Sequence, residues 1–464
     1  MTRPASRRQF FKQAGLTLPA LQALLNLRLA GGLASAAESP PGDYRALVCL
    51  FFPGGIDSFN LLVPRGASEY ADYAAIRQDL ALARDSLLPL TPATSPGLEL
   101  GLHPGMSGIR TLFQEGSAAF LANVGTLTDP ITKAQFEAGQ GRQPLGLFSH
   151  SDQIEQWQTS LTESRSARGW AGRAADLLES LNASQNVPMN ISLAGTNVWQ
   201  SGQNAIEYTV NAWGAESLRG YDPAETSPWS LTPIRTRAVD EHLAVGYDHL
   251  ITEAFQKKKT EAMAAYAQYN EATEAVSLPE SVTWPDSWFS RQMQRIARSI
   301  ASHNALGHRR QTFFVQYGGW DHHDEVLRNM GGQVPGFDAV VLAFQRTLQA
   351  LGLDQSVTLF TASDFGRTLT SNGAGSDHAW GGNHFVVGGA VRGNRIYGDY
   401  PDLYEDNPLD VGRGRLIPTT SVDSYFAELA LWFGVPRSDL ATVLPNIGTF
   451  FSPGSGGTPV GFLA

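Results

Sequence analysis

The stretch YRALVCLFFPGGIDSFN, Tyr44 to Asn60, decides the fold class. Its first part, up to Phe52, is an almost continuous apolar run of strand length. The run then meets the turn signal PGG, which ends it. A short apolar strand that stops at such a turn is typical of a strand buried on both faces of a parallel sheet. The stretch therefore indicates an α/β protein.

The same strand pattern recurs along the chain, separated by segments with helical spacing. Further strands are expected in SAAFLANVG (117–125), NVPMNISLAG (186–195), QTFFVQYGGW (311–320), SVTLFTASDFG (356–366) and NHFVVGGAV (383–391). Helices are expected within 103–116, 169–181, 288–306 and 336–353, and one long polar helix or a helix pair within 239–273. Strands that alternate with helices imply parallel crossover units. We therefore predict a single α/β domain over residues 44–464, a mostly parallel sheet flanked by helices.

One part of this domain lacks a regular pattern. Residues 197–233 are rich in Gly, Pro and Trp. Segments of this length and composition are commonly surface loops that carry function. We expect an irregular insertion that lies over the site.

Composition narrows the function further. The 464 residues carry 34 Lys and Arg against 44 Asp and Glu, a net charge of -10. Nonspecific binding of nucleic acid requires a basic face, so this balance disfavours DNA and RNA as partners. The single cysteine, Cys49, lies in the apolar run ALVCLFF and is most simply a small buried hydrophobe.

The first residues resemble an export signal. SRRQFFK (6–12) contains an Arg pair, a moderately apolar segment follows, and Ala34-Ser35-Ala36 fits a small-residue cleavage site. We interpret residues 1–37 as a twin-arginine signal peptide, which places the protein in the periplasm or outside the cell. The apolar segment is too weak for a stable membrane span. The alternative is a basic amphipathic start of a cytosolic protein.

Carboxylates and imidazoles gather where strands are expected to end. They are Asp57 after the first strand, Asp321, His322 and His323 after QTFFVQYGGW, Asp364 after SVTLFTAS, and Asp377, His378 and His384 in the loop before the last strand. The carboxyl ends of parallel strands meet at one edge of a sheet, where ligands bind. Carboxylate with imidazole suits zinc or manganese, and magnesium fits a carboxylate-rich position. Singly, such residues more often form turns or cap helices.

Several motifs together resemble a known family. PGGIDSFN, LFSHSDQIEQWQT, GWDHH, SDFGRT, SDHAWGGNHFVVGGAVRG and PTTSVDSYFAELALWFGV are similar in order and in flanks to the DUF1501 family of exported bacterial proteins. That family is similar to the alkaline phosphatase and sulfatase superfamily, whose members use paired metal ions at strand ends of an α/β sheet. The resemblance implies an alkaline-phosphatase/sulfatase-like fold and hydrolysis of phosphate or sulfate esters.

The resemblance also implies metal ligands. It assigns this role to Asp57, Asp321, His323 and Asp364, with His378 and His384 completing the set, for one or two ions. After Asp364 the superfamily has a His where this chain has Phe365, so one ligand is missing there. His378 is the candidate substitute. His322 is then a neighbour of the ligands or a substrate contact.

The superfamily needs a nucleophile, and a hydroxyl is expected here because Cys49 lies inside a strand. Ser149 in SHS is the main candidate and Ser58 the weaker one. A hydroxyl beside a metal ion can ionise and attack phosphorus or sulfur. The alternative is that FSHSDQ simply starts a helix, with Ser149 or Ser151 as its cap. Arg367 is expected to bind an anionic substrate, or else a carboxylate.

Two functions remain open from the sequence. The first is an exported metal-dependent hydrolase that acts on phosphate or sulfate esters of a small molecule or of an envelope polymer. The second is a non-enzymatic exported binding or assembly protein on the same scaffold. The missing His after Asp364 favours the second, and the density of Asp and His at strand ends favours the first.

Overall fold

The first apolar run forms the central strand β1 (Arg45–Phe52) of a large sheet. The protein is described here by a computed structural model that covers residues 43–93, 97–184 and 186–463, and the predicted signal peptide lies outside these residues. β1 pairs in parallel with β8 (Arg310–Gln316) on one side and with β9 (Val357–Ser363) on the other. The parallel pairing at the centre of the sheet confirms the fold class predicted from the sequence.

Within the described residues, the large sheet has nine strands in the order β11-β5-β10-β9-β1-β8-β6-β7, with β12 paired to β5. Its remaining strands are β5 (Ala118–Gly125), β6 (Asn190–Ser192), β7 (Glu207–Thr209), β10 (Gly382–Val387), β11 (Ile396–Tyr397) and β12 (Thr420–Ser421). A smaller antiparallel sheet contains β2 (Leu62–Pro64), β4 (Leu100–Leu102) and β3 (Leu88–Pro89).

One strand of the large sheet departs from the parallel pattern. β10 runs antiparallel to both β9 and β5. A parallel strand needs a crossover connection, usually a helix, to return to the same end of the sheet. Residues 364–381 between β9 and β10 contain no helix, so the chain simply turns back. The start of β10 therefore lies at the edge where β9 ends.

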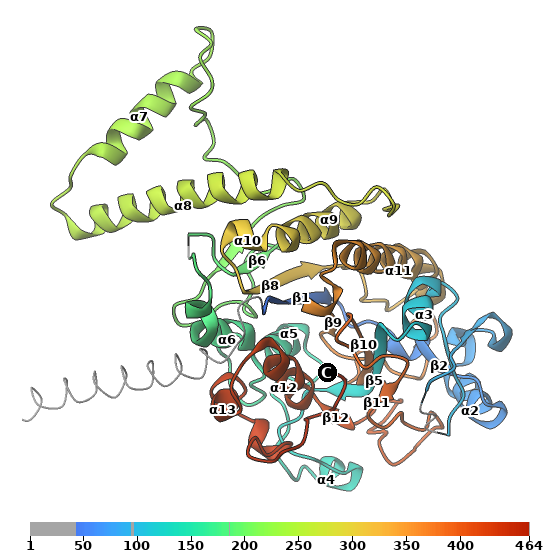
Figure 1. Cartoon of the computed structure of the whole chain (residues 1–464). Coiled ribbons are helices and arrows are strands. Elements are labelled where there is room, and N and C mark those ends of the chain that lie inside the picture. Colours follow the sequence, from blue (N-terminus) through green and yellow to red (C-terminus); the bar gives the residue numbers. More distant parts are fainter. Residues whose placement is uncertain (1–42, 94–96, 185, 464) are drawn as a thin grey trace, which may run out of the picture. The chain divides into compact units, whose positions relative to one another are not determined.

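Helices cover both faces of the large sheet (Figure 1). The helices of the described residues are α2 (Ala67–Arg77), α3 (Ser107–Gln114), α4 (Lys133–Glu137), α5 (His150–Thr159), α6 (Trp170–Leu178), α7 (Thr232–Ala244), α8 (Leu250–Glu274), α9 (Trp288–Ala301), α10 (His303–Leu306), α11 (Val326–Leu351), α12 (Val422–Phe433) and α13 (Leu440–Val443), and α7 projects away from the sheet. In Figure 1, α3, α9 and α11 lie on one side of the strands, and α6 and α12 lie on the other. This is the helix-flanked sheet that the alternating pattern predicts.

The two faces of β1 belong to two different hydrophobic cores, which explains its continuous apolar sequence. Ala46, Val48, Leu50 and Phe52 pack in the core that contains side chains of α3, α9 and α11. Leu47, Cys49 and Phe51 pack in the core that contains side chains of α6 and α12. Alternate residues of a strand point to opposite faces, so a strand covered on both sides has no polar face. The free thiol of Cys49 is buried, as the sequence predicts.

Two helices differ from their predicted extents. The pattern predicts a helix from Gly336, whereas α11 begins at Val326 and contains Pro335 inside it. Buried Val326, Met330 and Val334 continue the apolar stripe toward the start of the helix, and their packing outweighs the helix-breaking tendency of the proline. The polar segment 239–273 forms the helix pair α7 and α8, one of the two arrangements expected from the sequence, and α7 begins earlier than expected, at Thr232.

The irregular segment 197–233 packs against α8 and α9. The carbonyl oxygen of Trp213 accepts a hydrogen bond from Arg295 of α9 at 2.5 Å, and Ala215 N donates to Asn270 of α8 at 3.0 Å. The segment also contributes β7, at the end of the sheet order. Among the described residues, no helix combines the length and the apolar character that crossing a bilayer requires.

Candidate metal centre

The carboxyl ends of β1, β8 and β9 meet at one edge of the sheet because these strands are parallel neighbours. The turn after β1 and the turn after β8 touch there. A Cβ atom added at Gly54 would lie 2.5 Å from the backbone N of Asp321. Gly54 also has a φ of 112°, in the region that favours glycine. Glycine at this position therefore allows the two turns to meet.

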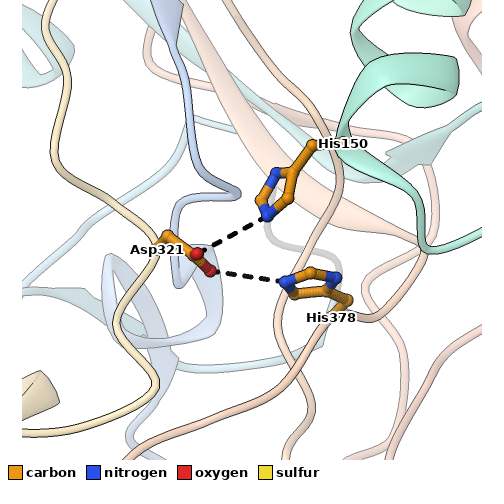
Figure 2. A group of neighbouring side chains, drawn as sticks. All are labelled: His150, Asp321 and His378. Carbon is orange, nitrogen blue, oxygen red and sulfur yellow. Dashed lines mark hydrogen bonds and ion pairs between the residues drawn. The ribbon is translucent and has the colours of Figure 1, made fainter.

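Three side chains from separate segments converge at this edge, as Figure 2 shows. Asp321 follows β8, His378 precedes β10, and His150 is the first residue of α5. Nε2 of His150 lies 3.6 Å from Oδ2 of Asp321, and Nε2 of His378 lies 3.3 Å from Oδ1 of Asp321. One ligand atom from each residue lies within 4.8 Å of the other two. Such a spacing suits three ligands of one metal ion.

A third imidazole adjoins these residues. Nε2 of His323 lies 3.0 Å from Oδ1 of Asp321 and 3.1 Å from Nε2 of His378. We call His150, Asp321, His323 and His378 the His/Asp cluster. Their side chains are 34%, 46%, 46% and 24% exposed, respectively. The cluster is therefore open to solvent, and a ligand can reach it.

Each imidazole of the cluster is held through its other nitrogen by an oxygen atom. Nδ1 of His150 lies 2.6 Å from Oδ2 of Asp364. Nδ1 of His378 lies 2.8 Å from the carbonyl oxygen of Phe148, and Nδ1 of His323 lies 3.1 Å from Oδ1 of Asp377. A carbonyl oxygen only accepts, so Nδ1 of His378 donates and its Nε2 carries the lone pair when the ring is neutral. Imidazoles that bind metal ions are commonly held in this way by a carboxylate or a carbonyl group.

The charges around the cluster favour the protonation states that bind metal. Burial raises the pKa of Asp321, but the hydrogen bond and charge of Arg367, together with the histidine charges, lower it more, so the pKa lies below its usual value. Burial lowers the pKa of His378, and the charges of His150 and Arg367 lower it further against the hydrogen bond to Phe148. An ionised carboxylate and a neutral imidazole are the forms that coordinate a metal ion.

The donor set fits a transition metal. Three imidazole nitrogens and one carboxylate are ligands that zinc accepts, and imidazole with carboxylate also suits manganese. Neutral imidazoles that face a carboxylate through their lone pairs repel it unless a cation lies between them. The cluster is therefore a candidate metal centre.

Asp57, expected to be a ligand, has a different partner. It is 1% exposed and forms an ion pair with Arg77, whose side chain is fully buried. Arg77 also donates to the carbonyl oxygen of Thr368 at 3.0 Å. The structure thus places Asp57 beside a fixed positive charge and does not bring it into the His/Asp cluster.

Arg367, expected to bind a substrate anion, is fully buried. Its guanidinium group donates to the carbonyl oxygens of Gly54 at 2.5 Å, Gly55 at 2.8 Å and Ser376 at 2.9 Å, and to the carboxylate of Asp321. All three guanidinium nitrogens therefore have protein partners. In this arrangement Arg367 positions Asp321 and joins the turns around it, which is the carboxylate pairing that the sequence left open.

His384, also expected to be a ligand, lies on β10 away from the cluster. It is 4% exposed, its Nδ1 lies 3.2 Å from Oγ1 of Thr361, and its ring centroid lies 4.7 Å from that of Trp157. Burial lowers the pKa of His384 to about 3, so the ring is neutral. His322 is buried as well, with its ring centroid 5.7 Å from that of Trp320. The structure brings neither residue to the His/Asp cluster.

Ser149, the expected nucleophile, occupies the N-cap position of α5, but its side chain makes no capping hydrogen bond. Its Oγ lies 3.2 Å from Oγ of Ser151. The residue immediately precedes His150 of the cluster. The position at the helix start agrees with the structural alternative from the sequence, although the hydroxyl makes no cap bond and instead interacts with Ser151 and Asp152.

His150 was not assigned as a ligand from the sequence. It begins a helix, whereas the other members of the cluster lie at strand ends or in the loop before β10. The only feature of the local sequence that could point to His150 as a site residue is its place beside Ser149 in LFSHSDQ. Asp364, predicted as a ligand, instead accepts hydrogen bonds from Nδ1 of His150 and from the backbone N of Gly54, at 3.0 Å for the latter.

Comparison with known families assigns the chain. Residues 44–413 match the family described as "Protein of unknown function (DUF1501)". The chain belongs to the DUF1501 family. The matched region contains every member of the His/Asp cluster, and the match confirms the family resemblance seen in the sequence motifs. No curated protein shows significant similarity to this DUF1501 chain.

Several solved structures are similar to this DUF1501 protein at low identity. One is a protein from the metabolism of multiple glycosaminoglycans by Bacteroides thetaiotaomicron, 11% identical over 85% of this chain and 74% of that chain, with a TM-score of 0.33. Another is a 2-O GAG sulfatase, 9% identical over 75% and 65%, with a TM-score of 0.25. A mutant of the alkaline phosphatase PafA is 13% identical over 71% and 64%, with a TM-score of 0.22. Scores this low assign no activity to the DUF1501 chain.

Proposed function

We propose that this DUF1501 protein is an exported metal-dependent hydrolase of phosphate or sulfate esters. The observation that carries the proposal is the convergence of three imidazole Nε2 atoms on the carboxylate of Asp321. Each imidazole is fixed through Nδ1 by an oxygen atom, so the arrangement is built rather than accidental. The open position of the cluster at the sheet edge gives a substrate access to it.

The residues of the cluster would hold a zinc or manganese ion. When bound, such an ion polarises an ester oxygen and lowers the pKa of a neighbouring hydroxyl or water. Asp321, fixed by Arg367, supplies the negative ligand, and the imidazoles supply neutral ligands. We propose one ion rather than two, because Arg77 already neutralises Asp57 and Arg367 already pairs with Asp321.

Ser149 is the proposed nucleophile. Its Oγ would attack phosphorus or sulfur, forming a new O–P or O–S bond while the bond to the leaving alcohol breaks and the alcohol takes up a proton. Water would then cleave the covalent ester and release phosphate or sulfate. The support for Ser149 is its place next to His150 and a hydroxyl that makes no helix-capping bond.

The proposed substrate is an anionic small molecule or an envelope polymer outside the cytoplasm. Support for this location is the order of the Arg pair, the apolar segment and the Ala-Ser-Ala site in residues 1–37. The twin-arginine route carries folded proteins, which suits a protein that acquires its metal ion before export.

A second candidate is a non-enzymatic exported binding or assembly protein that keeps the metal centre. The observation that favours it is the fixed pairing of two carboxylates with buried arginines, which leaves a single-ion site. Ser149 also contacts Ser151 rather than a cluster residue. In this case the protein binds metal but does not turn over an ester.

One experiment separates the two candidates. The purified protein is stripped with a chelator, reloaded with zinc, manganese or magnesium, and assayed for metal content by elemental analysis and for turnover of an aryl phosphate and an aryl sulfate. We expect one equivalent of zinc or manganese and turnover of one ester, both abolished in His378→Ala. One equivalent without turnover assigns the binding protein. Absence of metal under all loading conditions would overturn both.

A further inference from the structure

A tight turn places two arginines beside the His/Asp cluster. The turn spans residues 410–415, and Oδ1 of Asp410 accepts hydrogen bonds from the backbone N of Gly412 and of Gly414, both at 2.8 Å. Gly412, Arg413 and Gly414 all have left-handed φ values, of 106°, 63° and 68°. Three consecutive residues in this conformation make a sharp turn that few sequences adopt. Its shape fixes where Arg413 and Arg415 leave the backbone.

The turn is also held against the loop that follows β9. Oγ1 of Thr370 donates to the carbonyl oxygen of Arg413 at 2.9 Å, and the backbone N of Leu369 donates to the carbonyl oxygen of Gly414 at 3.2 Å. A Cβ atom added at Gly414 would lie 2.4 Å from Cβ of Leu369. The close approach requires glycine here, and it ties the turn to the segment that carries Arg367.

Arg415 is anchored to the cluster at two points. Its Nε donates to the carbonyl oxygen of His378 at 3.0 Å, and its guanidinium carbon lies 5.0 Å from the ring centroid of Phe148. The carbonyl oxygen of Phe148 in turn holds Nδ1 of His378. Within the described residues, the two Nη atoms of Arg415 make no hydrogen bond to the protein. They are therefore available to a ligand, next to a residue of the proposed metal centre.

Arg413 has a different partner. Its Nη2 lies 2.7 Å from Oδ2 of Asp377, whose Oδ1 holds Nδ1 of His323. Arg413 thus acts on the cluster through Asp377. Arg415, by contrast, has no carboxylate partner within hydrogen-bond distance among the described residues, so its charge is open to an external anion.

We propose that Arg415 binds the negatively charged oxygens of the ester group that reaches the His/Asp cluster, and that Arg413 is a positioning residue for Asp377 and His323. The proposal rests on the proposed function and adds to it the residue that would recognise the tetrahedral oxyanion of the substrate. A guanidinium group with both Nη atoms available donates two parallel hydrogen bonds to such oxygens. The stacking on Phe148 fixes the plane of that fork.

Anion titration tests the proposal. Inorganic phosphate and inorganic sulfate are titrated separately into the zinc-loaded protein by calorimetry, and the two titrations show which oxyanion the site prefers. Loss of a charged pair of hydrogen bonds should weaken anion binding about 10- to 100-fold in Arg415→Gln. Metal content, measured on the same samples, should not change, because Arg415 touches only the backbone of His378.

A matched control is Arg437→Gln. Arg437 also stacks on a ring, with its guanidinium carbon 5.8 Å from the ring centroid of Phe451, and donates to backbone carbonyl groups. It lies outside the cluster, so anion binding should stay unchanged. Arg415→Lys keeps the charge without the fork and should fall between the wild type and Arg415→Gln. A thermal melt of each variant identifies any loss of fold.

Arg413→Gln has a separate readout. We expect a lower affinity for zinc, measured by competition with a chelator, because Asp377 loses its fixed positive partner.

Anion affinity that is equal in Arg415→Gln, Arg415→Lys and the wild type, or no anion binding by the wild type, would overturn the proposal for Arg415. A protein that binds no metal ion refutes the proposed function instead, and the anion titration of the metal-free protein then tests Arg415 alone.

Discussion

Nδ1 of His150 lies 2.6 Å from Oδ2 of Asp364, and Nε2 of the same ring faces Asp321. This contact joins the start of α5 to the end of β9. Burial raises the pKa of Asp364, while the hydrogen bonds from His150 and from the backbone of Gly54 lower it in part. The buried carboxylate thus orients an imidazole that is half open to solvent. The pair sets which nitrogen of His150 is presented to a ligand.

Asp364→Asn should weaken metal binding without unfolding the protein. The backbone N of Gly54 and Nδ1 of His150 both contact Oδ2 of Asp364. An asparagine offers them at most an uncharged oxygen there, and if its amide nitrogen turns to donate to Nδ1 instead, the bond of Gly54 is lost and the ring proton moves to Nε2. We expect zinc affinity to fall about 10- to 100-fold, as is usual when such a partner is lost. Chelator competition measures it, and Asp85→Asn, on an exposed acidic residue, is the control. An unchanged affinity would show that Asp364 does not orient His150.

His384 and His378 should respond in opposite ways to the same substitution. His384→Asn removes a ring that packs against Trp157 and should lower the free energy of unfolding by roughly 1–3 kcal/mol. It should leave zinc content unchanged, since His384 lies outside the cluster. His378→Asn should remove zinc with little loss of stability in the metal-free protein. Zinc loss in His384→Asn would restore His384 as a ligand.

The parts of the fold that could be predicted from the sequence are those where packing imposes a local pattern of apolar residues. β1, β8 and β9 carry apolar residues on both faces because both faces of the sheet are covered. The antiparallel direction of β10 could not be predicted from its own sequence, because this direction depends on the absence of a crossover helix between β9 and β10. The start of α11 was missed because Pro335 suggests a boundary locally, while burial of the preceding turn decides otherwise.

The site followed only in part. Asp321, His323 and His378 come together as expected because their segments end or begin at one edge of the sheet. The partner of Asp57 and the choice of Arg367 between a substrate and a carboxylate could not be predicted, because ion pairs between distant segments leave no trace in local sequence. His150 could not be predicted as a member of the cluster, because it lies at the start of a helix and not at the end of a strand.

Arg367→Lys should destabilise the protein rather than only impair substrate binding. A lysine ammonium group cannot reach all the oxygens that Arg367 bonds through three nitrogens, which leaves buried carbonyl oxygens without partners. The expected loss is on the order of 3 kcal/mol in the free energy of unfolding, measured with denaturant. If stability is unchanged while the KM for an ester rises, Arg367 contacts the substrate.

Ser149→Ala should separate catalysis from folding. The Ser149 side chain makes no capping bond, so its removal should change the free energy of unfolding by less than about 0.5 kcal/mol. If Ser149 is the nucleophile, turnover of an aryl ester should fall about a thousandfold or more. Ser151→Ala removes the neighbouring hydroxyl and should retain most turnover. Full turnover in Ser149→Ala would assign the attack to a water molecule instead.

Asp423 should make stability depend on pH. The residue is fully buried, with Oδ1 accepting a hydrogen bond from Ser160 at 2.8 Å, and burial raises its pKa to about 7 from 3.8 despite that bond. The folded protein therefore keeps a proton that the unfolded chain has lost, and stability falls as pH rises from about 4 through about 7. Asp423→Asn cannot ionise, so it should exceed the wild type by roughly 2–4 kcal/mol at about pH 8 and match it near pH 4. Denaturant unfolding across this range measures the difference, with exposed Asp399→Asn as the control. Parallel pH curves for Asp423→Asn and the wild type would mean that Asp423 ionises with an ordinary pKa.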